Sequence, residues 1–236
     1  MSPCDKKVFC GFVADQGNTE NLNTLMKRFW EIEECHAPKS VQGDVEIYCE
    51  KHFKETHSRT ENGRYVVKMP IDPDFEIKLG QSKQIAIRKL NGLHKRLVLT
   101  PELLALYKNF MREYGALNHM EEVQDEIEPP TNYYIPHHSI YKPSSKTTKL
   151  RVVFNASIPT NTGYSLNSLL LNGGVVQDEL FNIILRFRTH KIAFIADVEK
   201  MFRQILIHPE QRDLQRIVWK ENMHNEIRTF RLNTIT

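Results

Sequence analysis

The sequence predicts a protein of the α+β class, with helices in its first half and mostly antiparallel strands in its second. Four early segments have apolar residues at helical spacing, namely 22–32, 44–56, 82–100 and 100–120. The part from residue 131 onward consists instead of short strand-like runs joined by turns, with one further helix. Helices followed by strands, without regular alternation, are typical of α+β proteins.

Local signals support the elements of the first half. Asp44 is suited to cap the second helix. Thr100 is a suitable N-cap for the fourth helix, Pro101 occupies its first position, and Gly115 lies near its end. The β-branched run GRYVVKMPI, residues 63–71, predicts a strand that ends at its proline.

An acidic stretch, EEVQDEIEPPTN at 121–132, is the best candidate for a domain edge. Its Pro129-Pro130 pair disfavours both a helix and a central strand. We therefore expect a mainly helical segment over 21–125 and a second domain over 126–236. Residues 1–20, which include the strand-like VFCGFV, are expected to be a remnant of a preceding domain.

The second half predicts a hairpin, then a helix, then further strands. The hairpin consists of YYIPHHSIYKP and KLRVVFNAS around the polar turn PSSKTTK, and VQDELFNIILRFRTHK has helical spacing. The run KIAFIAD, residues 191–197, predicts a buried strand. Three more strands are expected in FRQILIHP, LQRIVWKE and IRTFRLNTIT.

The composition indicates an intracellular, cytoplasmic protein without a membrane partner. Mean hydropathy is −0.47, no apolar run reaches the length of a membrane span, and the N-terminus has no apolar core of a signal peptide. The four cysteines all lie within the first 50 residues. In an intracellular chain they do not indicate a disulfide framework.

Charge is distributed unevenly along the chain. Residues 1–130 contain 18 Lys and Arg against 21 Asp and Glu, whereas residues 131–236 contain 14 against 8. The basic second half is the better candidate to bind a phosphate-rich partner. An ordinary solvated surface is the alternative, because the density of positive charge is modest.

Asp197 is a candidate metal ligand because it follows the apolar run KIAFIA directly. An ionised carboxylate is the hard oxygen ligand that Mg²⁺ prefers, and the end of a strand would hold it rigidly. A single carboxylate is not enough for two-metal phosphoryl transfer. Alternatively, Asp197 caps the following turn or pairs with Lys200 or Arg203.

The basic loop KTTKLR is a candidate phosphate-binding element. Lys146 and Lys149 supply positive charge, and Arg151 can bind a phosphate with a bidentate fork. A solvated hairpin tip is the alternative interpretation.

A zinc site near residues 35–57 is disfavoured, although the sequence contains possible ligands. Cys35 and His36 are adjacent and point apart in regular structure. Cys49 and His52 lie on a predicted amphipathic helix, with Cys49 on its apolar face, and His57 follows.

Long stretches of the second half occur in the order YYIPHHSIYKPSSKTTKLRVVFNAS, GYSLNSLLLNGGVVQDELFNIILRFRTHK, FIADVEKMFRQILIHPEQRDLQRIVWK and FRLNTIT. In this order they resemble the reverse transcriptase of the Pao/BEL class of LTR retrotransposons. Upstream, RFWEIEE, EKHFKETHSRTENGRYVVKMP and LGQSKQIAIRKLNGLHKRL resemble the segment between protease and reverse transcriptase. The resemblance implies a partial right-hand polymerase, with fingers and the first part of the palm behind a helical connector. Residues 1–20 would be the tail of the protease.

The resemblance also implies roles for individual residues. Asp197 matches the first catalytic aspartate, which binds both metal ions, and the backbone carbonyl of Val198 would also face a metal. Phe202 matches the aromatic residue under the sugar of the incoming nucleotide, where its ring excludes a 2′-hydroxyl. Arg151 matches the arginine of the fingers that contacts the triphosphate. Either Lys149 or Lys146 would be a second phosphate contact.

The implied parent activity is RNA-directed DNA synthesis with Mg²⁺. Its partners would be an RNA or DNA template–primer, a dNTP and the remainder of the Pol polyprotein. The motif with two adjacent aspartates is expected beyond Thr236, so we expect the isolated chain to be inactive and to bind Mg²⁺ weakly or not at all. The alternative is a non-catalytic nucleic-acid-binding or interaction protein derived from a retroelement.

Overall fold

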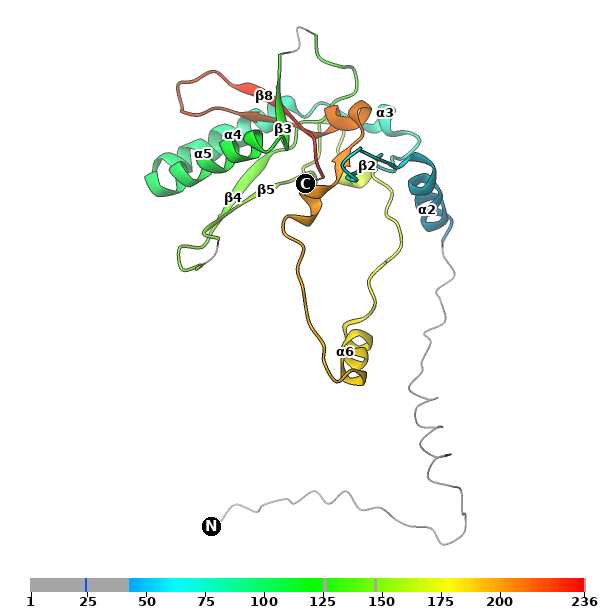
Figure 1. Cartoon of the computed structure of the whole chain (residues 1–236). Helices are drawn as coiled ribbons and strands as arrows, with labels where there is room; N and C mark the ends of the chain where they lie inside the picture. Colours follow the sequence, from blue (N-terminus) through cyan, green and yellow to red (C-terminus); the bar gives the residue numbers. More distant parts are fainter. Residues whose placement is uncertain (1–23, 25–42, 125–126, 147, 236) are drawn as a thin grey trace, which may run out of the picture. The chain divides into compact units, whose positions relative to one another are not determined.

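The computed structural model describes residue 24 and residues 43–124, 127–146 and 148–235 (Figure 1). The chain divides into two units at residues 41 and 42, and the fold below is that of the second unit. The predicted strand VFCGFV lies outside the described residues. So does the predicted first helix, apart from residue 24.

Two long helices form one side of the core, as the periodicity predicts. Helix α4 spans Lys83–Val98, and α5 spans Pro101–Ala116 with its proline in the first turn. The core-facing residues of α4 recur at helical spacing and are almost fully buried, namely Ala86, Leu90, Leu93 and Leu97. Pro101 starts α5 well because its missing N–H would have no partner at that position. Thr100 precedes it but makes no side-chain capping bond.

An antiparallel sheet in the order β3-β8-β7 packs against these helices. Its strands are β3 (Met120–Val123), β7 (Arg216–Trp219) and β8 (Arg228–Leu232). Ion pairs reinforce the β3–β8 pairing: Glu121 accepts from Arg231 at 2.7 Å, and Glu122 accepts from Arg228 at 3.0 Å. The acidic stretch that we predicted as a domain edge therefore begins inside a strand.

The predicted hairpin is confirmed. Strand β4 (His137–Tyr141) pairs antiparallel with β5 (Leu150–Phe154), so that His137 lies opposite Phe154. Lys142 N–H donates to the carbonyl of Lys149 at 2.8 Å and closes the turn. Alternate residues of β5 pack on the core, namely Leu150, Val152 and Phe154.

A small second sheet joins distant parts of the sequence in the order β1-β2-β6. Strands β1 (Ser58–Arg59) and β2 (Tyr65–Val67) are antiparallel, whereas β2 and β6 (Leu206–Ile207) are parallel. The strands predicted over 63–71 and within FRQILIHP are therefore shorter than expected. The start of the latter run is instead the 3₁₀ helix η2 (Met201–Gln204).

The remaining helices are shorter. Helix α2 (Asp44–Thr56) is confirmed, but Gly43 is its N-cap and Asp44 is its first helical residue. Helix α3 spans Phe75–Lys78. The other 3₁₀ turns are η1 (Asn167–Leu169) and η3 (Pro209–Gln215).

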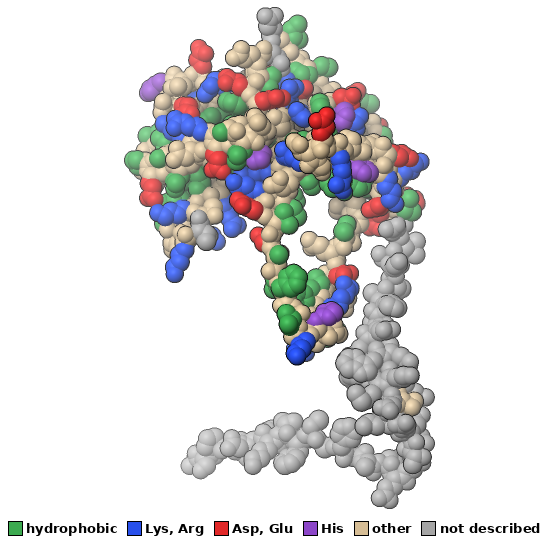
Figure 2. All heavy atoms as spheres, viewed as in Figure 1, with side chains coloured by type: hydrophobic (Ala, Val, Ile, Leu, Met, Phe, Trp, Pro, Cys, Tyr) green, Lys and Arg blue, Asp and Glu red, His purple; other side chains and the backbone are tan. Residues whose placement is uncertain are grey.

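The prediction of a buried strand at KIAFIAD is wrong. Between η1 and η2 the chain makes a long excursion with α6 (Leu180–Thr189) at its tip (Figure 1). Residues 193–198 have no regular secondary structure, and Ile192, Phe194 and Ile195 are 81%, 86% and 88% exposed. A strand needs a neighbouring ladder, and no described strand pairs with this run. Figure 2 shows hydrophobic side chains on the surface of this excursion.

These elements confirm the α+β class, with mainly antiparallel strands and one parallel pair. Within the part of the chain that the structure describes, no helix is long and apolar enough to cross a membrane.

A buried histidine connects three elements of the core. His137 of β4 accepts a hydrogen bond at Nδ1 from the Tyr107 hydroxyl of α5, at 2.5 Å. Its Nε2–H donates to the carbonyl of Val218 in β7, at 3.0 Å. The ring also lies near Trp219, at 5.9 Å between centroids. Burial lowers the pKa of His137 to about 4, so the ring is neutral in the folded protein at pH 7.

Acid should therefore destabilise the fold before carboxylates are protonated. Because the pKa of His137 is about 4 when folded and about 6.5 when unfolded, the unfolded state binds the extra proton. The contribution of the neutral His137 ring to the free energy of unfolding is fully present above pH 6.5. As the pH falls to 4, we expect a loss on the order of 3 kcal/mol in the free energy of unfolding, measured by urea titration.

His137→Gln supplies the matched test. At pH 7 it should lower the free energy of unfolding by about 1–2 kcal/mol, because Tyr107 and Val218 lose a well-placed partner. Its stability should then fall less steeply with acid than that of the wild type. The exposed His224→Gln is the control and should keep the wild-type slope. Equal acid slopes in wild type and His137→Gln would contradict the assignment.

Candidate functional site

A cavity of about 440 Å³ lies between η2 and strand β5. Its walls are residues 152–154 of β5 and residues 200–203, together with Tyr114 and Ile235. Phe202 is 59% exposed, so a large part of its ring is open to a bound molecule. The structure thus brings two sequence-predicted regions, the basic hairpin and the segment after Asp197, to one cavity.

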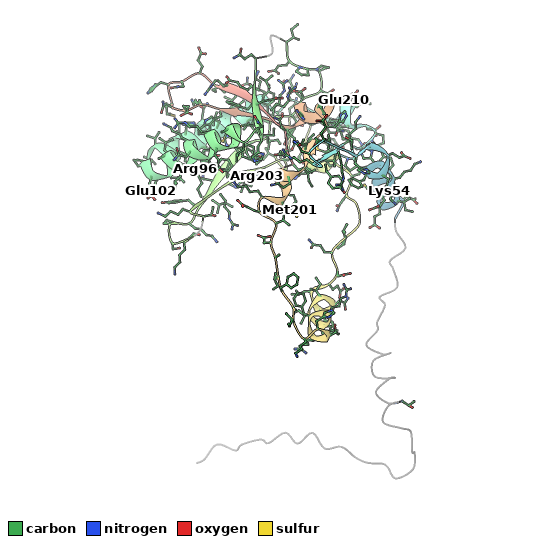
Figure 3. The ribbon with its side chains drawn as sticks, viewed as in Figure 1. Lys54, Arg96, Glu102, Met201, Arg203 and Glu210 are labelled. Carbon is green, nitrogen blue, oxygen red and sulfur yellow. The ribbon has the colours of Figure 1, made fainter. Side chains whose placement is uncertain are left out.

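Hydrogen bonds from a distant arginine fix the backbone of η2. Arg64, just before β2, donates from Nη2 to the carbonyl of Arg203 at 2.8 Å and from Nε to that of Gln204 at 3.2 Å. Arg203 itself lies over the rings of Tyr114 and Phe110, at 4.9 and 5.4 Å from their centroids. Figure 3 shows Met201 and Arg203 where the chain returns from its excursion. These contacts hold the two residues that follow Phe202.

Lys200 begins this segment with a left-handed backbone, at φ of 51°. This conformation is uncommon for a residue with a side chain, and it turns the chain sharply into η2. The Lys200 ammonium pairs with Glu113 of α5 at 3.1 Å. Lys200 is thereby tied to the same helix that supplies Tyr114.

Asp197 is exposed three residues before this turn. Neither of the pairings that we considered for it, with Lys200 or with Arg203, is formed, because Lys200 pairs with Glu113 and Arg203 lies over aromatic rings. Among the described residues Asp197 has no hydrogen bond or ion pair. The carboxylate is therefore available for a ligand.

Arg151 lies on the face of β5 that points away from the core. Leu150 and Val152 pack on the core, so alternation places Arg151 on the same face as Val153. Val153 lines the cavity, and Arg151 is two residues away along that face, about 7 Å. Its guanidinium can therefore reach a molecule bound at the cavity.

The two candidate lysines lie elsewhere. Lys149 pairs with Glu102 of α5 at 3.3 Å, and Glu102 is labelled in Figure 3. Lys146 is exposed in the turn of the hairpin. Lys149 is thus engaged by a carboxylate of α5, whereas Arg151 has no such ion pair among the described residues.

Three cations lie near the buried ring of His119, the residue before β3. Burial is the main cause that lowers the pKa of His119, and the charges of Arg203, Arg64 and Lys200 lower it further. Cations so close to one buried ring give this region a positive potential. Glu113 partly offsets it.

The residues present do not by themselves form a magnesium site. Within the described ranges, no group of three or more His, Cys, Asp or Glu side chains is arranged to hold a metal ion. Asp197 and the Val198 carbonyl supply only two protein oxygens, whereas Mg²⁺ needs an octahedral set completed by other groups.

Two of the histidines considered as zinc ligands contact backbone carbonyls. His52 Nε2 lies 3.3 Å from the carbonyl of Lys68, and His57 Nδ1 lies 2.6 Å from that of Phe53. Cys35 and His36 lie outside the described residues.

Several residues of the site could not be predicted from the sequence. Tyr114 and Ile235 line the cavity, and Arg64 positions η2, although all three are distant in sequence from Phe202. A second cavity, of about 480 Å³, adjoins the first and shares Val153, Phe154 and Ile235 with it.

Comparison with known proteins adds no assignment. No protein-family model matches the chain, and no curated protein gives a significant match to it.

Arg64→Ala should release η2. We expect hydrogen exchange of the amides in residues 201–205 to become about tenfold faster, because two charge-assisted hydrogen bonds to this backbone are lost. Mass-spectrometric hydrogen exchange measures this directly. Arg59→Ala is the control, since Arg59 bonds the hydroxyl of Tyr65 and has no contact with η2. Unchanged exchange in Arg64→Ala would show that Arg64 does not position η2.

Proposed function

We propose that the chain contributes the fingers and the first part of the palm of a reverse transcriptase of the Pao/BEL retrotransposon class. The observation that favours this function is the shared cavity of Phe202 and β5, with Arg151 on the adjacent face. The family resemblance assigns a sugar contact to Phe202 and a triphosphate contact to Arg151. Phe202 lines the cavity and Arg151 lies two residues from Val153 along β5, an arrangement that suits such a nucleotide site.

Charge around the cavity supports a phosphate-containing ligand. Lys200 and Arg203 line it, Arg64 bonds the backbone of η2, and Arg151 is exposed on β5. Arginine suits this task because its planar fork matches phosphate oxygens. A dNTP or the backbone of a template–primer is the proposed ligand.

Phe202 would select the sugar by its volume. Its half-exposed ring forms part of the cavity wall, and an aromatic ring packed under a deoxyribose leaves no space for a 2′-hydroxyl. In the parent enzyme, Asp197 and the Val198 carbonyl would be ligands of Mg²⁺, which stabilises charge on the transferred phosphate.

The separation of Arg151 from Lys149 gives a direct test. Arg151→Ala should weaken binding of an RNA–DNA template–primer about tenfold and reduce the salt dependence of binding by about one phosphate contact. Lys149→Ala should have a smaller effect, because Lys149 is paired with Glu102 on α5. Fluorescence anisotropy over a range of salt concentrations measures both. Absence of binding at low salt, or equal effects of the two substitutions, would count against the proposed site.

A non-catalytic nucleic-acid-binding protein is the second candidate. The exposed Asp197, which has no carboxylate partner among the described residues, favours it. Neither candidate predicts primer extension by this chain alone, so the choice of nucleotide separates the two. A polymerase fragment should bind a dNTP more tightly than the matching rNTP, and Phe202→Ala should remove this preference. Template–primer binding without any preference between dNTP and rNTP supports the second candidate.

A further inference from the structure

The second cavity, of about 480 Å³, has mainly apolar walls. They come from seven separate parts of the chain and include Met69, Ile135, Leu166, Leu170 and Ile207. The cavity shares Val153, Phe154 and Ile235 with the cavity of Phe202, so the two adjoin. Its size and apolar lining are typical of small-molecule sites.

Gln215 is the buried polar group of this cavity. It lines the cavity and is only 4% exposed, yet its Nε2 has no hydrogen-bond partner among the described residues. A buried amide without a partner costs free energy, so a ligand that hydrogen-bonds to it is favoured.

The backbone around Gln215 is firmly held. Gln215 ends η3, and the next residue starts β7. Tyr133 N–H donates to the carbonyl of Asp213 at 3.0 Å, and Arg216 N–H donates to the carbonyl of Tyr133 at 3.0 Å. The amide of Gln215 is therefore carried on a rigid frame, as a selective binding group requires.

The side-chain carboxamide of Gln215 has a hydrogen-bond donor, its N–H, next to an acceptor, its oxygen. The edge of adenine offers the complementary pair, an exocyclic amino donor next to a ring-nitrogen acceptor, and Gln recognises adenine in this bidentate way. A single peptide amide offers the same pair but would leave most of this apolar cavity empty. The planar base of a nucleoside is the better fit.

Polar groups at the rim suit the sugar of a nucleoside. His138, Asn155 and Asn167 line the cavity, and Asn167 is exposed. Asn155 Oδ1 accepts from the Ser157 N–H at 3.0 Å, which leaves the Asn155 amino group to donate to a hydroxyl.

We infer that this cavity binds the adenine base of a nucleoside or of a bound strand, with Gln215 as its bidentate partner. The inference deepens the proposed function and rests on it for the nucleotide nature of the ligand. Binding of the free nucleoside, however, requires neither Arg151 nor Phe202.

Calorimetric titration of adenosine into the full chain tests the inference. Wild type should bind adenosine, and inosine should bind about tenfold more weakly because a carbonyl replaces the amino donor. Gln215→Met, which keeps the volume but removes the amide, should weaken adenosine binding about tenfold or more. Arg151→Ala should leave it unchanged. Short oligodeoxyadenylate, compared with oligothymidylate, shows whether a base within a strand also enters.

Several results would overturn the inference. The first is that wild type does not bind adenosine. The second is that inosine binds as tightly as adenosine, and the third is that Gln215→Met binds adenosine as tightly as wild type. Thermal melting checks that Gln215→Met is folded. If Gln215→Met is unfolded, Gln215→Glu is used in its place, because it is isosteric with glutamine but lacks the amide N–H donor. Template–primer binding that depends on Arg151, without adenosine binding, refutes only this inference. Adenosine binding without template–primer binding refutes only the proposed function.

Discussion

The two hydrogen bonds of His137 are the constraint on which the rest of the fold depends. They join β4 to α5 through Tyr107 and to β7 through Val218, in the interior where water cannot replace a lost partner. Trp219 packs on Tyr107 and on His94 of α4, at 5.1 Å in each case. The hairpin therefore has a fixed position relative to both helices. Because β5 belongs to the hairpin, the cavity wall that it forms is fixed in the same way.

Local patterns predicted the elements that depend on local physics. Helices α4 and α5 follow from apolar spacing and from Pro101, and the hairpin follows from two β-branched runs around a polar turn. The run 191–197 shows the limit of such patterns. Its composition suits a buried strand, but burial depends on a neighbour that composition does not specify. The short pair β2–β6 could not be predicted either, since its partners are distant in sequence.

The residues of the candidate site also fall into two groups, those that the sequence could predict and those that it could not. Phe202 and Arg151 could be selected from the sequence because each belongs to a motif of adjacent residues. Gln215 could not be selected from the sequence. A glutamine at the end of a 3₁₀ turn has no distinctive pattern, and only the structure shows that it lines a cavity. The role of Arg64 could not be predicted either. Arg64 bonds backbone carbonyls, and every residue has one, so its partners cannot be recognised from the sequence.

The contact between Arg64 and the carbonyl of Arg203 spans 139 positions, and the parallel β2–β6 pair closes a loop of similar length. Closing so long a loop is entropically costly, and contacts of this range slow folding. During synthesis the segment that bears Phe202 leaves the ribosome long after Arg64 does. The wall opposite β5 is therefore among the last parts to form, and a nascent chain that stops before residue 207 would have no β6 to hold it.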